Sequence, residues 1–158
     1  MKKILLIALI GGILVSCSNK KEQELRDADD EMIQEYLSDN GIADAIKLED
    51  SGVYYRITEE GNGVDFPTSQ SIIRVFYKGY LLDGTVFDER VEGEDDYLES
   101  FIGNLVFGWQ IALLNFSKGS KGQIFIPSHA GYGERPPAGS DIPENAILIF
   151  DIHLVNFF

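Results

Sequence analysis

The stretch that decides the fold runs from Leu105 to Phe116 and reads LVFGWQIALLNF. It contains Trp109, the only tryptophan of the chain. Apolar side chains recur here at the i, i+3, i+4 and i+7 spacing of one helix face: Trp109, Ala112, Leu113 and Phe116. Lys118–Gly119 supplies a basic last turn and a glycine stop. Because the other long segments after Gly52 read as strands or loops, we expect a sheet curled around this one short helix.

Length and charge limit the class of protein. The chain has 158 residues, which suits one domain of ordinary size with an appendage. It carries 26 acidic side chains against 13 Lys and Arg. No basic stripe is present to neutralise phosphates, so nucleic acid is excluded as a partner. We interpret the excess negative charge as a source of solubility.

The first residues resemble a bacterial lipoprotein signal. Lys2 and Lys3 form a positive start, and the apolar run Ile4–Val15 is too short to span a bilayer as an ordinary helix. The run ends at a small residue directly before Cys17, the only cysteine, which therefore cannot form an internal disulfide. The resemblance implies removal of residues 1–16 and lipidation of Cys17. A plain secretory signal with an incidental cysteine is the alternative.

Residues 17–51 are expected to form a lipidated tether and an amphipathic helix. Ser18–Asp30 is polar and reads as the tether. A helix is predicted from about Glu24 to Ser38, ending near Asn40–Gly41. Its apolar stripe could pack on its own domain or on a partner. The residue after Cys17 is not the aspartate that retains some lipoproteins at the inner membrane, which favours the outer membrane, facing the periplasm or the cell surface.

Residues 52–158 predict an α+β domain with a curved antiparallel sheet. The predicted strands are Val53–Thr58, Ile72–Leu81, Thr85–Asp88, Gly122–Pro127 and Ala146–Val155. Asp83–Gly84 is a hairpin-turn signal, and the acidic segment Glu89–Glu99 is predicted to be a solvated loop. The last strand is almost continuously apolar, which predicts a central position with cover on both faces.

The sequence lacks most signatures of catalysis. It has no P-loop, no dinucleotide-binding glycine pattern and no nucleophile elbow. Cys17 is assigned to lipidation, so no thiol remains as a nucleophile. His129 and His153 lack the spacing of metal ligands. We expect a structural role for His153, whereas His129 lies in a loop and could border a site. Neither a metal nor a cofactor is implied.

Aromatic residues instead lie near the predicted turns, in seven short segments whose order along the chain is characteristic. The segments are Tyr77–Gly79, Leu82–Asp88, Val106–Trp109, Ile126–Pro127, Gly131–Gly133, Ile142–Pro143 and Leu148–Asp151. Together they resemble the FKBP-type peptidyl-prolyl cis-trans isomerases over about Gly52–Phe158. The resemblance implies the FKBP-like fold, preceded here by a lipoprotein signal and an N-terminal helix.

The resemblance also implies an apolar pocket. Trp109 would form its floor, and Ile142 would close one side. The walls would come from Tyr77, Phe87, Val106 and Phe150. Leu105 and Val106 would present backbone amides, while Tyr132 would offer its hydroxyl and Asp88 would stand at the rim. The family's preceding-strand aromatic has three candidates, Tyr97, Leu98 and Phe101. Gly131 and Asp141 also depart from the family pattern, which bears on substrate preference.

The implied activity is prolyl isomerisation during the folding of exported envelope proteins. Tyr132 would donate a hydrogen bond to a substrate carbonyl, and Asp88 would orient its neighbours or face the rotating carbonyl. A turn-capping role for Asp88 is the alternative. The implied partners are proline-containing polypeptides, the membrane through Cys17, and a macrolide of the FK506 type. Two other functions stay open: a lipid-anchored chaperone or binding module that uses the pocket without turnover, and a structural subunit of an envelope machine, such as the isomerase lipoproteins associated with gliding.

Overall fold

The computed structural model describes the backbone of residues 8–93 and 96–158 and the side chains of residues 19–93 and 96–158. The start of the predicted signal, residues 1–7, lies outside this range, as does the side chain of Cys17. Among the helices of the described part, none has the length and hydropathy that a bilayer crossing requires.

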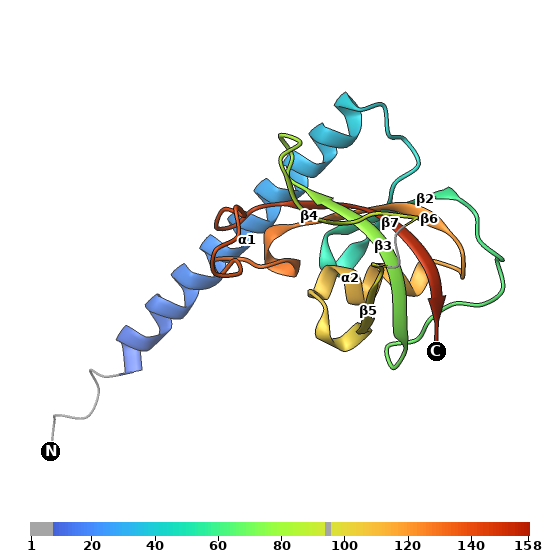
Figure 1. The fold of residues 1–158 in the computed structure, drawn as a ribbon. Helices are drawn as coiled ribbons and strands as arrows, with labels where there is room; N and C mark the ends of the chain where they lie inside the picture. The colour runs from blue at the N-terminus through green and yellow to red at the C-terminus, as the bar shows by residue number, and fades with distance from the viewer. Residues whose placement is uncertain (1–7, 94–95) are drawn as a thin grey trace, which may run out of the picture.

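The predicted α+β fold, with a curved antiparallel sheet around a short helix, is confirmed (Figure 1). The strands follow the order β1-β2-β6-β7-β3-β4, and β5 also pairs with β3. All of these pairings are antiparallel. The strands are β1 (Ile46–Leu48), β2 (Val53–Glu59), β3 (Ile72–Tyr80), β4 (Val86–Arg90), β5 (Leu98–Phe101), β6 (Lys121–Ile126) and β7 (Leu148–Phe157).

The central helix is shorter than the stretch that predicts it. Helix α2 spans Phe107–Ala112 and continues into the 3-10 turn η3, Leu113–Asn115. The four predicted core side chains, Trp109, Ala112, Leu113 and Phe116, are all buried against the concave face of the sheet. Gly108 lies so close to β6 that an added Cβ would stand 2.5 Å from Ile126. This close approach requires glycine at the start of α2.

Strand β7 holds the centre of the sheet, as its apolar run predicts. It pairs with β6 on one side and β3 on the other. Leu148 and Phe150 belong to the core around α2, whereas Ile149 belongs to a second core on the opposite face. All three are buried, so this part of β7 is covered on both faces.

The second core lies beneath the N-terminal helix. Helix α1 spans Ala8–Asp39, so the segment predicted as a tether is helical, and the helix begins well before Glu24. Ion pairs and hydrogen bonds at i, i+4 spacing support this polar part, including Arg26 with Glu22. The apolar stripe packs on its own domain, where Ile33 and Leu37 meet the outer face of the sheet. Figure 1 shows α1 in blue on the side of the sheet away from α2.

The acidic segment 89–99 is only partly a loop, as far as residues 89–93 and 96–99 show. Glu89 and Arg90 complete β4, and residues 98–99 begin β5. Cross-strand contacts explain the difference, since Arg74 of β3 pairs with Glu99 at 2.5 Å. Strands β4 and β5 therefore lie along opposite halves of the same edge of β3.

Candidate functional site

A cavity of about 310 Å³ opens between α2, strands β3 to β5 and the loop after β6. It brings together every residue for which the sequence predicts substrate binding or catalysis: Tyr77, Phe87, Asp88, Leu105, Val106, Trp109, Tyr132, Ile142 and Phe150. The distant parts of the chain that hold them meet because β3, β4 and β7 are neighbours in the sheet and α2 lies beneath it. Their roles toward a substrate stay predictions.

Perpendicular aromatic rings shape the cavity. The Trp109 indole, only 3% exposed, lies beneath it. The Phe150 ring stands at 88° to the indole with centroids 5.0 Å apart, and Tyr77 meets the indole at the same angle and 5.3 Å. Phe87 stands at 86° to Phe150. Edge-to-face pairs of this kind contribute about 0.5–1.5 kcal/mol each, so they favour the ring arrangement that leaves the cavity open.

Gly79 makes room for two of these rings. A Cβ added at this position of β3 would lie 2.6 Å from Phe87 and 2.8 Å from Phe150. Any other residue would force the rings to move. The glycine of the Tyr77–Gly79 segment therefore serves the shape of the cavity.

Asp88 contacts a neighbouring side chain instead of capping the hairpin turn. Its Oδ2 accepts a hydrogen bond of 2.5 Å from the phenol of Tyr77. Burial, together with this bond to a carboxylate, raises the pKa of Tyr77. The turn is capped by Asp83, whose Oδ1 accepts the Thr85 amide, a bond that lowers the pKa of Asp83. Arg90, two residues further along β4, pairs with Asp96 at 3.0 Å.

Tyr132 reaches the cavity from the loop after β6. It follows the 3-10 turn η4, Ser128–Ala130, and its half-buried ring lines the cavity. Burial raises the pKa of the Tyr132 phenol, and the Asp88 carboxylate adds to the effect. The phenol therefore stays protonated, and able to donate a hydrogen bond, throughout the physiological pH range.

The two backbone amides expected to face a substrate, those of Leu105 and Val106, differ in their hydrogen bonds within the protein. The Leu105 amide donates to Ile102 O at 3.1 Å, and Leu105 O accepts the Gln110 side chain at 2.7 Å. The Val106 amide donates to no other residue of ranges 8–93 and 96–158. Of the two amides expected to face a substrate, only that of Val106 is therefore available.

Four further residues line the cavity: Leu98, Asn104, Pro137 and Ser140. The sequence predicts none of them as a definite site residue. Leu98 was one of three candidates for the preceding strand, and it is the one that reaches the cavity. Tyr97 packs against Phe76 instead. Pro137 and Ser140 come from the same Gly- and Pro-rich loop as Ile142, where periodicity offers no signal for the direction of a side chain.

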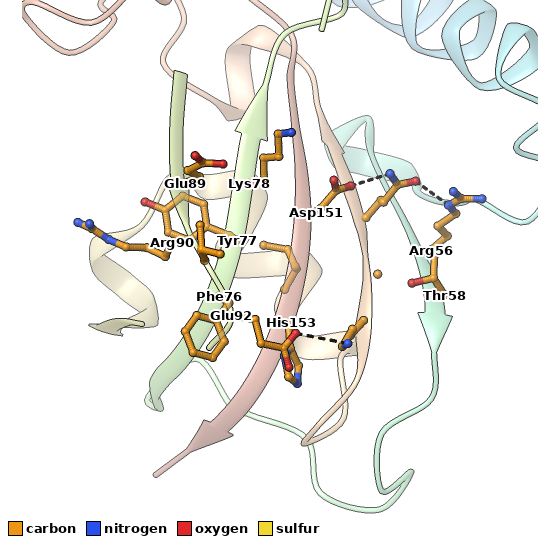
Figure 2. A pocket seen from close by; sticks show the side chains of 15 residues that line it. Arg56, Thr58, Phe76, Tyr77, Lys78, Glu89, Arg90, Glu92, Asp151 and His153 are labelled. Atoms are coloured by element: carbon orange, nitrogen blue, oxygen red, sulfur yellow. Dashed lines mark hydrogen bonds and ion pairs between the residues drawn. The ribbon is translucent and has the colours of Figure 1, made fainter. Parts of the chain in front are cut away.

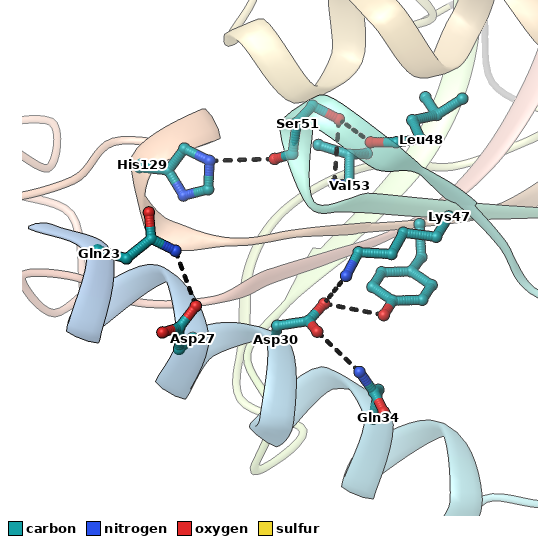
Figure 3. Close-up of polar contacts among 10 residues, drawn as sticks. Gln23, Asp27, Asp30, Gln34, Lys47, Leu48, Ser51, Val53 and His129 are labelled. Carbon is teal, nitrogen blue, oxygen red and sulfur yellow. Dashed lines mark hydrogen bonds and ion pairs between the residues drawn. The ribbon is translucent and has the colours of Figure 1, made fainter.

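Neither histidine borders this cavity. His129 Nε2 lies 3.0 Å from Ser51 O, close to α1 (Figure 3). His153 lies in β7, facing a second hollow of about 380 Å³ on the outer face of the sheet (Figure 2). Its Nδ1 stands 3.3 Å from Glu92, which also pairs with Lys121. Within the described residues, no group of three metal-ligating side chains occurs.

A curved sheet with an aromatic cavity above a short helix defines a class of protein that can host a small apolar ring. Sequence comparison gives the class its name. The sequence model of the FKBP-type peptidyl-prolyl cis-trans isomerases matches residues 63–155, more than half of the chain. The chain belongs to this family.

Individual relatives agree with this assignment. The chain is 37% identical over 123 residues to the FKBP-type peptidyl-prolyl cis-trans isomerase FkpA of Aeromonas hydrophila, covering 77% of this chain and 44% of the relative. It is 35% identical over 120 residues to the FKBP-type 22 kDa isomerase of Escherichia coli, covering 76% and 57%. The crystal structure of Escherichia coli FkpA superposes with a TM-score of 0.70 at 26% identity, covering 95% of this chain and 68% of that one. The chain spans about half the length of the curated relatives it matches.

Proposed function

We propose that this protein is a peptidyl-prolyl cis-trans isomerase that assists the folding of exported envelope proteins. The observation that carries the proposal is the open aromatic cavity above Trp109, walled by Tyr77, Phe87 and Phe150. Its volume of about 310 Å³ suits a proline ring with part of the preceding residue. The substrates would be proline-containing segments of other polypeptides.

The residues suit a reaction that needs neither a nucleophile nor a metal. Rotation about the X–Pro bond crosses a barrier of roughly 18–20 kcal/mol, which amide resonance creates. The twisted amide has less resonance and less charge separation than the planar amide. An apolar cavity therefore disfavours the planar form more than the twisted one, which lowers the barrier. A 10⁴-fold acceleration requires only about 5–6 kcal/mol of such differential binding.

Two donors would hold the rotating amide. The Tyr132 phenol and the Val106 amide both lie at the cavity, and the Val106 amide donates to no other described residue. Donors of this kind can bind a carbonyl oxygen whose position is reached only in the rotated state. Asp88 accepts a hydrogen bond from the Tyr77 phenol. It would therefore act by fixing the Tyr77 ring rather than by contacting the substrate.

We propose further that Cys17 is lipidated and anchors the protein at the outer membrane, facing the periplasm or the cell surface. Support comes from the signal-like residues before it and from similarity to the protein named outer membrane protein MIP of Legionella longbeachae, 34% identical over 138 residues. Helix α1 from Cys17 to Asp29, whose carboxylate bonds to Ser128, would then hold the domain roughly 18 Å from the anchor, at 1.5 Å per residue. Similarity to FK506-binding protein 1 of Debaryomyces hansenii, at 36% identity, supports an FK506-type macrolide as a ligand.

The test is catalysed isomerisation of an Ala-Leu-Pro-Phe peptide by protein that starts at Ser18, in an assay without a coupling protease. The proposal predicts acceleration that an FK506-type macrolide inhibits. Folded protein that binds the peptide without accelerating its isomerisation would favour the binding-module alternative. Comparing catalysed refolding of a proline-limited protein with suppression of aggregation separates these functions in a protein substrate.

A further inference from the structure

We propose that Asp29 of helix α1 is a positioning residue for the isomerisation. It fixes the turn that carries Tyr132, and so links the helix on the outer face of the sheet to the cavity on the inner face. This inference rests on the proposed function, because it assigns Asp29 a part in that reaction.

Asp29 makes two short hydrogen bonds to a single residue far away in the sequence. Its Oδ2 accepts the backbone amide of Ser128 at 2.8 Å and the Ser128 hydroxyl at 2.6 Å. Both side chains are fully buried. Hydrogen bonds to a carboxylate are roughly twice as strong as those between neutral groups, and here water cannot compete for them. Ser128 is therefore held in place by α1.

Ser128 in turn holds the backbone on both sides of Tyr132. Its carbonyl oxygen accepts hydrogen bonds from the amides of Gly131, at 3.1 Å, and Gly133, at 2.9 Å. Gly133 adopts a positive φ of 54°, and its carbonyl accepts the Asn145 amide at 2.7 Å. Tyr132 is thus the one residue between two glycines that are tied to the same oxygen. Two flanking glycines leave the segment few side-chain contacts of its own, so backbone hydrogen bonds hold its conformation. Ser128 O accepts two of them, although the Gly131 amide is shared with Pro127 O at 3.1 Å.

Docking of the helix alone does not account for Asp29. Ile33 and Leu37 already fasten α1 to the sheet by apolar packing, and Asp30 does so by polar contacts (Figure 3). Asp30 pairs with Lys47 at 2.7 Å and accepts a hydrogen bond of 2.8 Å from the Tyr54 phenol. Within the described residues it makes no hydrogen bond to η4. The second oxygen of Asp29, Oδ1, is buried and has no hydrogen-bond partner among the described residues. Burying a carboxylate with one unpaired oxygen costs free energy, so helix docking alone does not explain its presence. Both of its hydrogen bonds go to Ser128, in the turn before Tyr132.

Asp30 supplies the matched control. Asp29→Ala and Asp30→Ala remove neighbouring carboxylates that both join α1 to the domain, but only Asp29 touches Ser128. Ser128→Ala removes the hydroxyl donor while leaving its backbone amide, and serves as the second variant if Asp29→Ala does not fold. Each variant is measured in three ways on protein starting at Ser18: unfolding in urea, kcat and KM for the Ala-Leu-Pro-Phe peptide, and the ring resonances of Tyr132 in tyrosine-labelled protein.

The proposal predicts that Asp29→Ala lowers kcat by roughly five- to tenfold, since small misplacements of a catalytic group have effects of this order or larger. Asp29→Asn, which keeps an acceptor for the Ser128 amide, is expected to recover part of the loss, and Ser128→Ala to show a smaller one. The Tyr132 resonances are expected to shift in these variants but not in Asp30→Ala, which keeps wild-type kcat even if it is less stable.

Equal kcat and unchanged Tyr132 resonances in folded Asp29→Ala or folded Ser128→Ala would overturn the proposal. So would an equal loss of kcat in Asp30→Ala, because helix docking alone would then explain it. Absence of isomerisation by the wild-type protein would instead contradict the proposed function. In that event the Tyr132 resonances still show whether Asp29 holds the turn.

Discussion

The phenol of Tyr77, in β3, donates a hydrogen bond of 2.5 Å to Asp88, in the neighbouring strand β4. The Tyr77 ring also stands edge-on to the Trp109 indole. A carboxylate at the rim thereby fixes a wall of the cavity against its floor. We propose that Asp88 acts through this contact, by setting the orientation of a ring that a bound proline would touch.

Tyr77→Phe and Asp88→Ala are expected to have similar and non-additive effects. Each change breaks the same hydrogen bond, so each should lower kcat/KM by about three- to tenfold, or roughly 0.7–1.4 kcal/mol. The double variant should lose little more than either single one. A double-mutant cycle in the peptide assay measures this. Additive losses would mean that Asp88 acts on the substrate independently of Tyr77.

Gly79→Ala is expected to abolish most of the activity. The new Cβ would stand 2.6 Å from Phe87 and 2.8 Å from Phe150, so two rings that wall the cavity would have to move. Gly63→Ala is the control, because its Cβ would meet no atom within 4 Å and its positive φ of 69° affects stability rather than the shape of the cavity. We expect kcat/KM within about twofold of wild type for this variant. Equal activity of both variants would show that the close approach at Gly79 does not shape the site.

Activity should stay constant from neutral pH to about pH 10, near the ordinary pKa of tyrosine. Burial raises the pKa values of Tyr77 and Tyr132, so both phenols keep their protons beyond that point. Because the folded pKa values are raised, their contribution to stability is fully present below the unfolded pKa and is lost as pH rises through the folded ones. The check is kcat/KM measured against pH for wild type and Tyr132→Phe. A decline of wild-type activity centred below pH 10 would contradict the assignment of Tyr132 as a buried donor.

Ile33→Ala should destabilise the protein by about 2–5 kcal/mol. Ile33 is fully buried between α1 and the outer face of the sheet, where it packs in the second core with Phe125 and Ile149. Met32→Ala is the control, since Met32 on the same helix is 40% exposed. Urea unfolding of protein starting at Ser18 compares the two. Equal stabilities would mean that α1 does not dock on the domain in solution.

The sequence predicts the inner core better than the connections. Trp109 to Phe116 carry a clear helical periodicity, and the run of β7 is almost continuously apolar. Both segments lie where these patterns indicate. Strand β1 was missed because three residues at a sheet edge are too few to show an alternation. The polar half of α1 shows no helical pattern in the sequence, because its helix is supported by i, i+4 polar pairs rather than by an apolar stripe.

In the candidate site, too, some features can be predicted from the sequence and others cannot. Its aromatic residues occur in short segments that resemble a known family, so their meeting in one cavity could be predicted. The bond from Tyr77 to Asp88 and the bonds from Ser128 to Asp29 depend on tertiary distances. Nothing in local sequence distinguishes Asp29 from Asp30, and only the direction of each side chain on the helix separates their roles.

The most direct test of the account is NMR of a proline peptide exchanging between cis and trans in the presence of protein that starts at Ser18. The account predicts accelerated exchange together with intermolecular NOEs between the proline ring protons and the Trp109 indole. Accelerated exchange is expected to disappear, with these NOEs, when an FK506-type macrolide is added. Exchange at the uncatalysed rate with folded protein, or catalysed exchange without any contact between proline and Trp109, would contradict it.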